Sequence, residues 1–166
     1  MTPRKRLVPH PAHLLAGLGI RQPAHLLAGL VCTLALVSAP FAAHAADLTV
    51  LVDNVASDAG QVLVGVFDQA ETFPRAMLRG ERAPASTRDA SGRVKLVFTG
   101  LAPGRYALSA FHDLDDNGKL NANVMGLPTE PYGFSRDARG NFGPPAFADA
   151  AVDMPEAGLT VKVRVQ

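Results

Sequence analysis

From residue 47 onward the apolar residues of the chain recur with a period of two. The clearest example is residues 159–166, where four aliphatic side chains alternate with Thr, Lys, Arg and Gln. Every second side chain of a strand faces the same side, so this alternation predicts strands with one buried face, typical of antiparallel sheets. The predicted strands are residues 48–53, 62–67, 93–98, 106–112, 147–153 and 159–166.

The predicted strands are short and are separated by turn signals rich in Gly, Pro and Asp, at residues 57–60, 89–92, 102–104 and 156–158. About seven strands in a chain of this length favour an all-β fold, an antiparallel Greek-key sandwich of the transthyretin-like or Ig-like type. Residues 71–79 have a faint helical period, and one or two helical turns are expected there. The segment Leu101–Tyr106, L-A-P-G-R-Y, is similar to the L-x-P-G-x-Y corner of transthyretin-like and collagen-adhesin B-type modules, which supports the sandwich.

The first 45 residues differ in character from the rest. They contain no acidic residue, carry the cluster Arg4-Lys5-Arg6, and continue into the apolar run 26–37. This order, followed by the small-x-small site Ala43-His44-Ala45, is typical of a secretory signal. We therefore expect residues 1–45 to be a signal peptide cleaved after Ala45, and residues 46–166 to be a single sandwich domain in the periplasm or outside the cell. An uncut N-terminal anchor is the alternative.

Removal of the leader changes the chemistry that the chain can carry. Four of the 16 Lys and Arg residues lie in it, so 12 remain against 15 acids, a net charge of −3. A mature chain without a basic patch is not expected to bind nucleic acid. The single Cys and four of the five His also lie in the leader, which leaves His112 as the only histidine. This excludes Cys nucleophiles, disulfides and metal centres with two imidazoles from the mature chain.

Residues 113–146 contain no convincing strand, although the other connections are short. Connections of 34 residues are uncommon unless they are functional or disordered. The aromatic and aliphatic residues in this segment argue against disorder. We therefore expect one long ordered loop across one end of the sandwich.

The start of this loop, D-L-D-D-N-G-K-L-N, follows the first places of a calcium-binding loop, with Gly118 at the sharp turn. The twelfth place, where a Glu should close the site, is Val124, so Asn121, Asn123 or Glu130 would have to complete it. A metal-free turn stabilised by Asx side chains is the alternative, and both remain open. The predicted calcium ligands are Asp113, Asp115, Asn117, Lys119 through its carbonyl, and Asn121.

A second set of residues forms a candidate ligand or partner surface. Aromatic side chains at Tyr132 and Phe134 either hold the loop onto the sandwich or form a platform for a sugar or peptide. His112 is either a strand-end residue bonded to a neighbour or part of that surface. The predicted surface residues are His112, Glu130, Tyr132 and Phe134.

Three stretches of the loop, H-D-x-D-x-N-G-K-L, G-x-P-x-E-P-Y-G-F-S and G-x-F-G-P-P-x-F, resemble the signature of domain of unknown function 2141, a bacterial family. The resemblance spans residues 48–165. It implies a small exported all-β protein and no established activity or ligand. Members of the family often carry Asp where this chain has Asn121, which lowers the charge available to a cation here.

Three functions follow from these residues. The first is an exported, monomeric, non-enzymatic module that binds an envelope protein or a glycan and whose acidic loop is stabilised by calcium. The second is a hydrolase with His112 as base and Ser135 as nucleophile, or with the carboxylate pair Asp115 and Glu130. The third is a purely structural module for assembly of the cell envelope.

Overall fold

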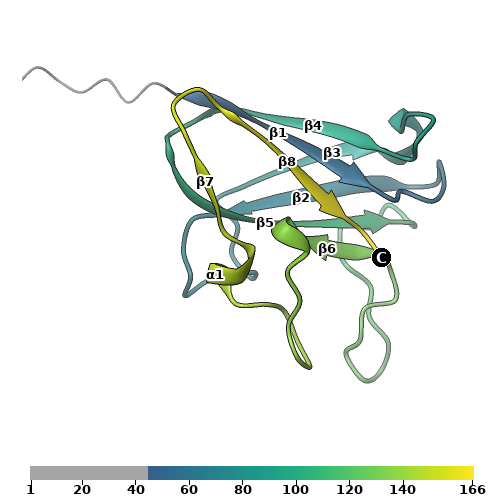
Figure 1. Ribbon diagram of the computed structural model, residues 1–166. Helices are drawn as coiled ribbons and strands as arrows, with labels where there is room; N and C mark the ends of the chain where they lie inside the picture. The colour runs from purple at the N-terminus through teal and green to yellow at the C-terminus, as the bar shows by residue number, and fades with distance from the viewer. Residues whose placement is uncertain (1–44) are drawn as a thin grey trace, which may run out of the picture. The chain divides into compact units, whose positions relative to one another are not determined.

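The computed structural model describes residues 45–166, which form two β-sheets packed against each other (Figure 1). The smaller sheet has the order β4-β1-β8, and the larger has the order β3-β2-β5-β6, with β7 paired to β5. This confirms the predicted all-β sandwich. The strands are β1 (Ala46–Asp53), β2 (Gln61–Phe67), β3 (Arg79–Pro84), β4 (Val94–Leu101), β5 (Gly104–Asp113), β6 (Tyr132–Phe134), β7 (Val152–Met154) and β8 (Leu159–Arg164).

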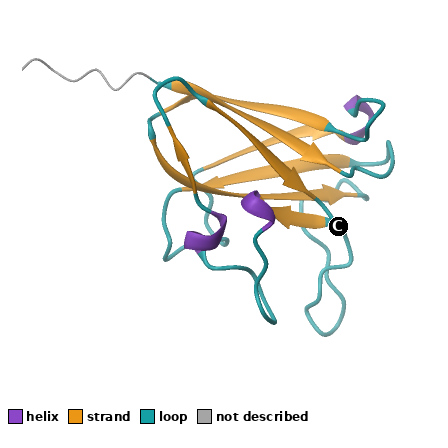
Figure 2. Cartoon of the chain, in the orientation of Figure 1, coloured by secondary structure: helices purple, strands orange, loops and turns teal. Residues whose placement is uncertain are grey.

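Helical structure in the described residues is limited to short segments (Figure 2). They are the 3-10 turns Ala85–Thr87 and Ser135–Asp137 and the single turn α1 (Phe147–Ala150). Within residues 45–166 no helix is long and apolar enough to cross a membrane. The predicted signal peptide lies outside the described residues, except for Ala45.

The core lies between the sheets and is built by the alternating residues that the sequence indicated. In β1, Leu48, Val50 and Val52 are fully buried, and in β8, Val161 and Val163 are buried. The opposing sheet contributes apolar side chains from β2 and from β5 to the same cluster. Burial of this apolar surface is the main stabilising term of such a domain.

The pairing of β8 differs from the prediction of purely antiparallel strands. β8 runs parallel to β1, with Val50 opposite Val161 and Val52 opposite Val163. The alternation could not reveal this direction, because it reports that one face of a strand is buried and says nothing of which neighbour provides its hydrogen bonds.

Three other elements also differ from the prediction. Residues 71–79 form turns rather than a helix, and β3 begins at Arg79. Residues 147–153 begin with α1 instead of a strand, because Phe147 and Ala150 belong to a second apolar cluster. The long loop contains the short strand β6, whose Tyr132 and Phe134 pair with Phe111 and Ser109 of β5.

The corner between β4 and β5 has the geometry that the L-x-P-G-x-Y motif indicates. The hydroxyl of Tyr106 donates a hydrogen bond of 2.8 Å to the carbonyl of Ala102, four residues upstream. Burial, with a smaller contribution from the carboxylate of Asp68, raises the pKa of Tyr106. The buried ring therefore fixes the turn by both packing and a hydrogen bond.

The outer face of the larger sheet is partly covered by the second apolar cluster. Phe73, from the connection between β2 and β3, packs edge to face on Phe67, Phe134 and Phe147, with ring centroids 5.1, 5.7 and 5.9 Å away. This cluster fixes one end of the outer face. It leaves the neighbouring part of that face uncovered.

Candidate functional site

The acidic loop begins at the end of β5 with Asp113, whose side chain is fully buried. Its Oδ2 accepts hydrogen bonds of 2.8 Å from Gln61 Nε2 and from the backbone N–H of Gly118, and its Oδ1 accepts one of 3.2 Å from the N–H of Asn117. Burial acts to raise the pKa of Asp113, but these hydrogen bonds, chiefly from Gly118 and Gln61, outweigh it and keep the pKa below its ordinary value. The structure thus favours a buried carboxylate that is ionised.

Glu130 is the second buried carboxylate of the loop, with 6% of its surface exposed. Its Oε1 accepts the N–H of Leu114 and its Oε2 accepts the N–H of Asn121, each at 2.9 Å. Glu130 therefore joins the beginning of the loop to its middle. It supplies a carboxylate to a loop whose twelfth place, Val124, has none.

Asp115 lies between these groups at the surface. Its Oδ2 accepts hydrogen bonds of 3.0 Å from the side-chain amides of Asn117 and Asn121, which also bond each other at 2.9 Å. The Oδ1 of Asn117 accepts the N–H of Lys119 at 2.8 Å. The structure thus places all five predicted metal ligands along one turn, and four of their side chains belong to a single hydrogen-bonded network.

Oxygen atoms from Asp113, Asp115 and Glu130 lie within 4.8 Å of one another, so this triad could hold a metal ion. Ligand oxygens on opposite sides of Ca²⁺ are about 5 Å apart, at ~2.4 Å each from the ion. Each carboxylate has about four lone-pair sites, and no more than three hydrogen bonds are donated to any of the three. The hydrogen bonds that the three carboxylates accept from the protein therefore leave lone pairs free for a cation.

His112 and Ser135 are not brought together. His112 is fully buried, and its Nε2 lies 2.8 Å from the carbonyl of Ala59. A carbonyl only accepts, so Nε2 carries the proton, and the buried Nδ1 has no partner. Ser135 is also buried. Its hydroxyl accepts the N–H of Leu108 at 3.0 Å and donates to the carbonyl of Ala150.

Leu108, the partner of Ser135, precedes His112 by four residues in β5. At ~3.3 Å per residue of strand, this separates the two by roughly 13 Å. They therefore form no base–nucleophile pair. Both Ser135 and His112 take part in holding the loop and the strands together.

Of the four predicted partner-surface residues, His112, Glu130 and Phe134 are buried, and Tyr132 is half-buried. The prediction of His112 and Glu130 as surface residues is corrected. Glu130 is buried where the loop returns to the end of β5. His112 lies on the same face of β5 as the core residues Leu108 and Ala110, and it is the strand-end residue bonded to a neighbour that was the alternative prediction. Tyr132 and Phe134 line a groove on the outer face of the larger sheet.

This groove has a volume of about 460 Å³ and crosses strands β3, β2, β5 and β6. Its floor follows from the strand register, since Gly80 lies opposite Gly65 and Gly65 lies opposite Ser109. Three neighbouring positions thus have little or no side chain, and the ring of Phe67 packs against Gly65 while the sulfur of Met77 packs against Gly80. The larger residues around these positions form the walls. The walls include Leu63, Phe67, Met77, Phe111, Leu120, Tyr132 and Phe134.

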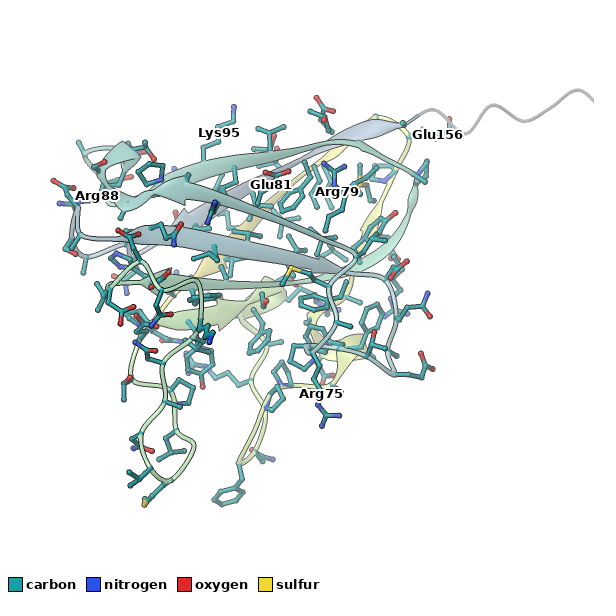
Figure 3. The ribbon with its side chains drawn as sticks, turned by 180° about the vertical axis from the view of Figure 1, so that it is seen from behind. Arg75, Arg79, Glu81, Arg88, Lys95 and Glu156 are labelled. Carbon is teal, nitrogen blue, oxygen red and sulfur yellow. The ribbon has the colours of Figure 1, made fainter. Side chains whose placement is uncertain are left out.

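The polar groups of the groove are few. Arg82, the outer neighbour of Leu63, lines it and forms none of the ion pairs found in residues 45–166. The adjacent Glu81 pairs with Arg79 at 3.5 Å, and Arg79 also donates to the carbonyl of Thr99 in β4. In Figure 3, Arg79 and Glu81 lie beside each other, well away from Arg75. The groove therefore has one cationic side chain that is not neutralised.

Sequence reasoning identified two of the groove residues and missed its floor and its cation. The available signal was the glycine in the middle of β2, because a glycine inside a strand often marks a close approach or a vacant surface. It becomes a groove only when β3 places Gly80 beside it.

A family model described as "Uncharacterized protein conserved in bacteria (DUF2141)" matches residues 50–162. The chain belongs to this family. The match contains the strands from β2 to β7, the acidic loop and the groove of this DUF2141 domain. No curated protein and no solved structure matches the chain.

Proposed function

We propose that this DUF2141 domain is an exported, non-enzymatic binding module whose ligand occupies the groove on the outer face of the larger sheet. The observation that carries the proposal is the groove itself. Its volume of about 460 Å³ lies in the range of small-molecule sites, roughly 300–1,000 Å³, and such sites combine apolar walls with a few polar groups. The residues proposed for hydrolysis, His112 and Ser135, lie elsewhere and are buried.

The groove favours an elongated apolar molecule with an anionic end. Leu63, Met77 and Phe111 are not fully buried and offer apolar surface. The polar or charged side chains of the lining are those of Ser109, Arg82, Tyr132 and Glu81, and Glu81 is paired with Arg79. A glycan would bring many hydroxyls that these few groups could not satisfy. The unneutralised guanidinium of Arg82 complements a carboxylate or phosphate at one end of the ligand.

Calcium binding by the acidic loop is the second part of the proposal. Gly118 and Leu120 of this loop line the groove, so an ion held by Asp113, Asp115 and Glu130 would fix one wall of the ligand site. Calcium is favoured over transition metals because all the candidate ligands are oxygen atoms.

The ligand proposal is tested with dodecanoate, an apolar chain with a carboxylate, by isothermal titration calorimetry. Ser109→Leu fills the floor and is expected to weaken binding by at least about tenfold, the equivalent of roughly 1.4 kcal/mol. Thr49→Leu is the matched control, because Thr49 is a half-buried residue at the centre of the other sheet. Absence of dodecanoate binding to the wild type, or equal binding by Ser109→Leu, would refute it.

The contribution of Arg82 is separated by comparing two ligands. Arg82→Gln is expected to weaken dodecanoate about two- to fivefold, as for an exposed ion pair, and to leave dodecanol unchanged. A loss of affinity for both ligands would instead show that Arg82 acts through packing.

The calcium proposal is tested by thermal unfolding of the chelated protein with added CaCl₂. With a dissociation constant in the range ~10⁻⁴ to 10⁻³ M, ~10 mM calcium adds about 1.4 to 2.7 kcal/mol of stability. Asp115→Asn should abolish the rise in melting temperature, whereas Asp116→Asn should retain it, since Asp116 is outside the triad. An unchanged wild-type melting temperature in calcium removes the metal from the proposal.

Export and monomeric state complete the proposal. The support for export is the charge-then-apolar order of residues 1–45, and β1 begins at Ala46, directly after the predicted cleavage site. N-terminal sequencing of protein recovered from the periplasm or medium should begin at Ala46. Retention in the cell of an uncut chain would contradict this, and light scattering after gel filtration tests the monomer.

A further inference from the structure

Two loops carry the most exposed large apolar side chains of residues 45–166. In the first tip loop, residues 121–129, Val124 and Met125 are 105% and 74% exposed, and in the second tip loop, residues 140–145, Phe142 is 111% exposed. An isolated exposed apolar residue is ordinary, but several at the ends of protruding loops indicate an interaction site. Both loops project from the same side of the domain (Figure 1).

The first tip loop is ordered by its own hydrogen bonds. Its base is closed by the N–H of Thr129, which donates to the carbonyl of Asn121 at 2.8 Å, and Ala122 bridges to Pro128. At the tip, the side-chain oxygen of Asn123 accepts the N–H groups of Met125 and Leu127 at 2.9 and 3.0 Å.

Two further amides of this tip are satisfied in the same way. The N–H of Gly126 donates to the carbonyl of Asn123, whose own N–H donates to the carbonyl of Leu127, both at 2.9 Å. The backbone donors at residues 123, 125, 126, 127 and 129 thus need no water. Transfer of such a tip into an apolar medium avoids most of the cost of unsatisfied amides.

The second tip loop presents its aromatic ring from a backbone conformation that disfavours it. Phe142 has a φ of 62°, in the left-handed region that a bulky residue rarely adopts. Gly140 allows the chain to turn back closely on Gly143 and Pro144, and the two prolines at 144 and 145 have no N–H to leave unsatisfied. Because the ring is fully exposed, it adds no buried apolar surface that would stabilise the fold.

We infer that these two tip loops insert into the surface of a lipid bilayer and seat the domain on a membrane through Val124, Met125, Leu127 and Phe142. Residues 120–129 and 140–148 contain no charged side chain, so insertion to the depth of the interface desolvates no ion. Interfacial proteins bury apolar groups at the boundary between headgroups and acyl chains in this manner.

The shape of the tips favours lipid over a protein partner. Both tips protrude, and a protein would need two matching cavities to cover them, whereas acyl chains close around any apolar projection. The internal hydrogen bonds of the first tip loop also favour lipid, because a protein partner can supply hydrogen bonds to backbone amides and lipid tails cannot. A second copy of this chain could receive one tip in its own apolar groove, and the experiment separates that outcome.

The first measurement uses the fact that the chain has no Trp. Phe142→Trp places a single fluorophore at the second tip, and Val97→Trp places one at an exposed apolar position of β4. With vesicles of phosphatidylcholine and phosphatidylglycerol, the emission of Phe142→Trp should shift to the blue and be quenched by lipids brominated in the acyl chain, while Val97→Trp should show neither effect. Equal behaviour of the two variants would overturn the inference.

The second measurement compares vesicle flotation of the full chain with that of Met125→Ser combined with Phe142→Ser. Loss of two apolar side chains should lower the partition coefficient by about tenfold or more, and Val97→Ser should not change it. An apolar leader that stays on the chain would carry all variants to the vesicles equally. Equal flotation of all variants would therefore overturn the inference. Concentration-dependent self-association that these same substitutions abolish, without vesicle binding, would assign the tips to a second copy and equally overturn it.

Discussion

Replacement of Glu130 by Gln is the sharpest test of how the acidic loop is held. The carboxylate is almost completely buried and accepts one backbone N–H on each oxygen, from Leu114 and from Asn121. Glutamine has the same shape, so the substitution opens no cavity. Whichever way its amide turns, however, its NH₂ group faces an N–H, and one hydrogen bond is replaced by two opposed donors.

The magnitude follows from the chemistry of that one hydrogen bond. A hydrogen bond to a charged group contributes about 1.5 to 3 kcal/mol, and a donor left unsatisfied in a buried place costs a similar amount. Water can reach Asn121, which is only half-buried, so the lower part of the range applies. We expect Glu130→Gln to lower the free energy of unfolding by about 2 kcal/mol, which for ~120 residues corresponds to a melting temperature lower by roughly 6 to 10 °C.

The assay is thermal and urea unfolding followed by circular dichroism, with a chelator present so that no metal contributes. Glu156→Gln is the matched control, because Glu156 is exposed in the turn before β8 (Figure 3), and it should change stability by less than about 0.5 kcal/mol. Hydrogen exchange by NMR should show that the amides of Leu114 and Asn121 lose protection. If the two Gln variants unfold at the same temperature, Glu130 does not hold the loop in the way described.

Three other substitutions test the framework around the site, each by urea unfolding. Tyr106→Phe removes the hydrogen bond to the exposed corner at Ala102 and should cost about 1 kcal/mol; no change would mean that water replaces the hydroxyl fully. Ser135→Ala leaves the buried N–H of Leu108 without its acceptor and should cost about 1 to 3 kcal/mol, with stability equal to wild type as the contrary result. Gly133→Ala places a methyl group against the carbonyl of Arg164 and should cost about 3 kcal/mol, and an unaffected domain would show that the end of β8 can move away.

Recognition of elements from the sequence succeeded where burial repeats locally. β1 and β8 bury every second residue along most of their length, β4 does so over its first five positions and β2 over its first four, and this alternation was visible without knowledge of their partners. β3 was missed because R-G-E-R-A-P is an edge strand with little apolar content. β6 was missed because three residues are too few to show a period.

The residues of the candidate site also divide into those that a local pattern reveals and those that only the tertiary structure brings together. Asp113, Asp115 and Asn117 could be recognised because their spacing of two is a local property of a turn. Glu130 could be named only as one of three residues that could complete the site, beside Asn121 and Asn123. Its place in the triad depends on the loop returning to the end of β5 after sixteen residues. For His112 the sequence left two interpretations open, and the structure decides for the strand-end residue, because its ring is buried and bonds the carbonyl of Ala59, fifty-three residues away in the chain.

By itself the sequence determined the properties that arise from neighbouring residues: strands with one buried face, a corner closed by Tyr106, an acidic turn, and a first segment, residues 1–45, that contains no acidic residue. Only the tertiary structure decided the parallel pairing of β8 with β1, the groove above Gly65, Gly80 and Ser109, and the two apolar tips on one side of the domain. The reason is that backbone preference and burial act over a few residues, whereas register and loop return depend on contacts between residues far apart in the chain, which no local pattern contains.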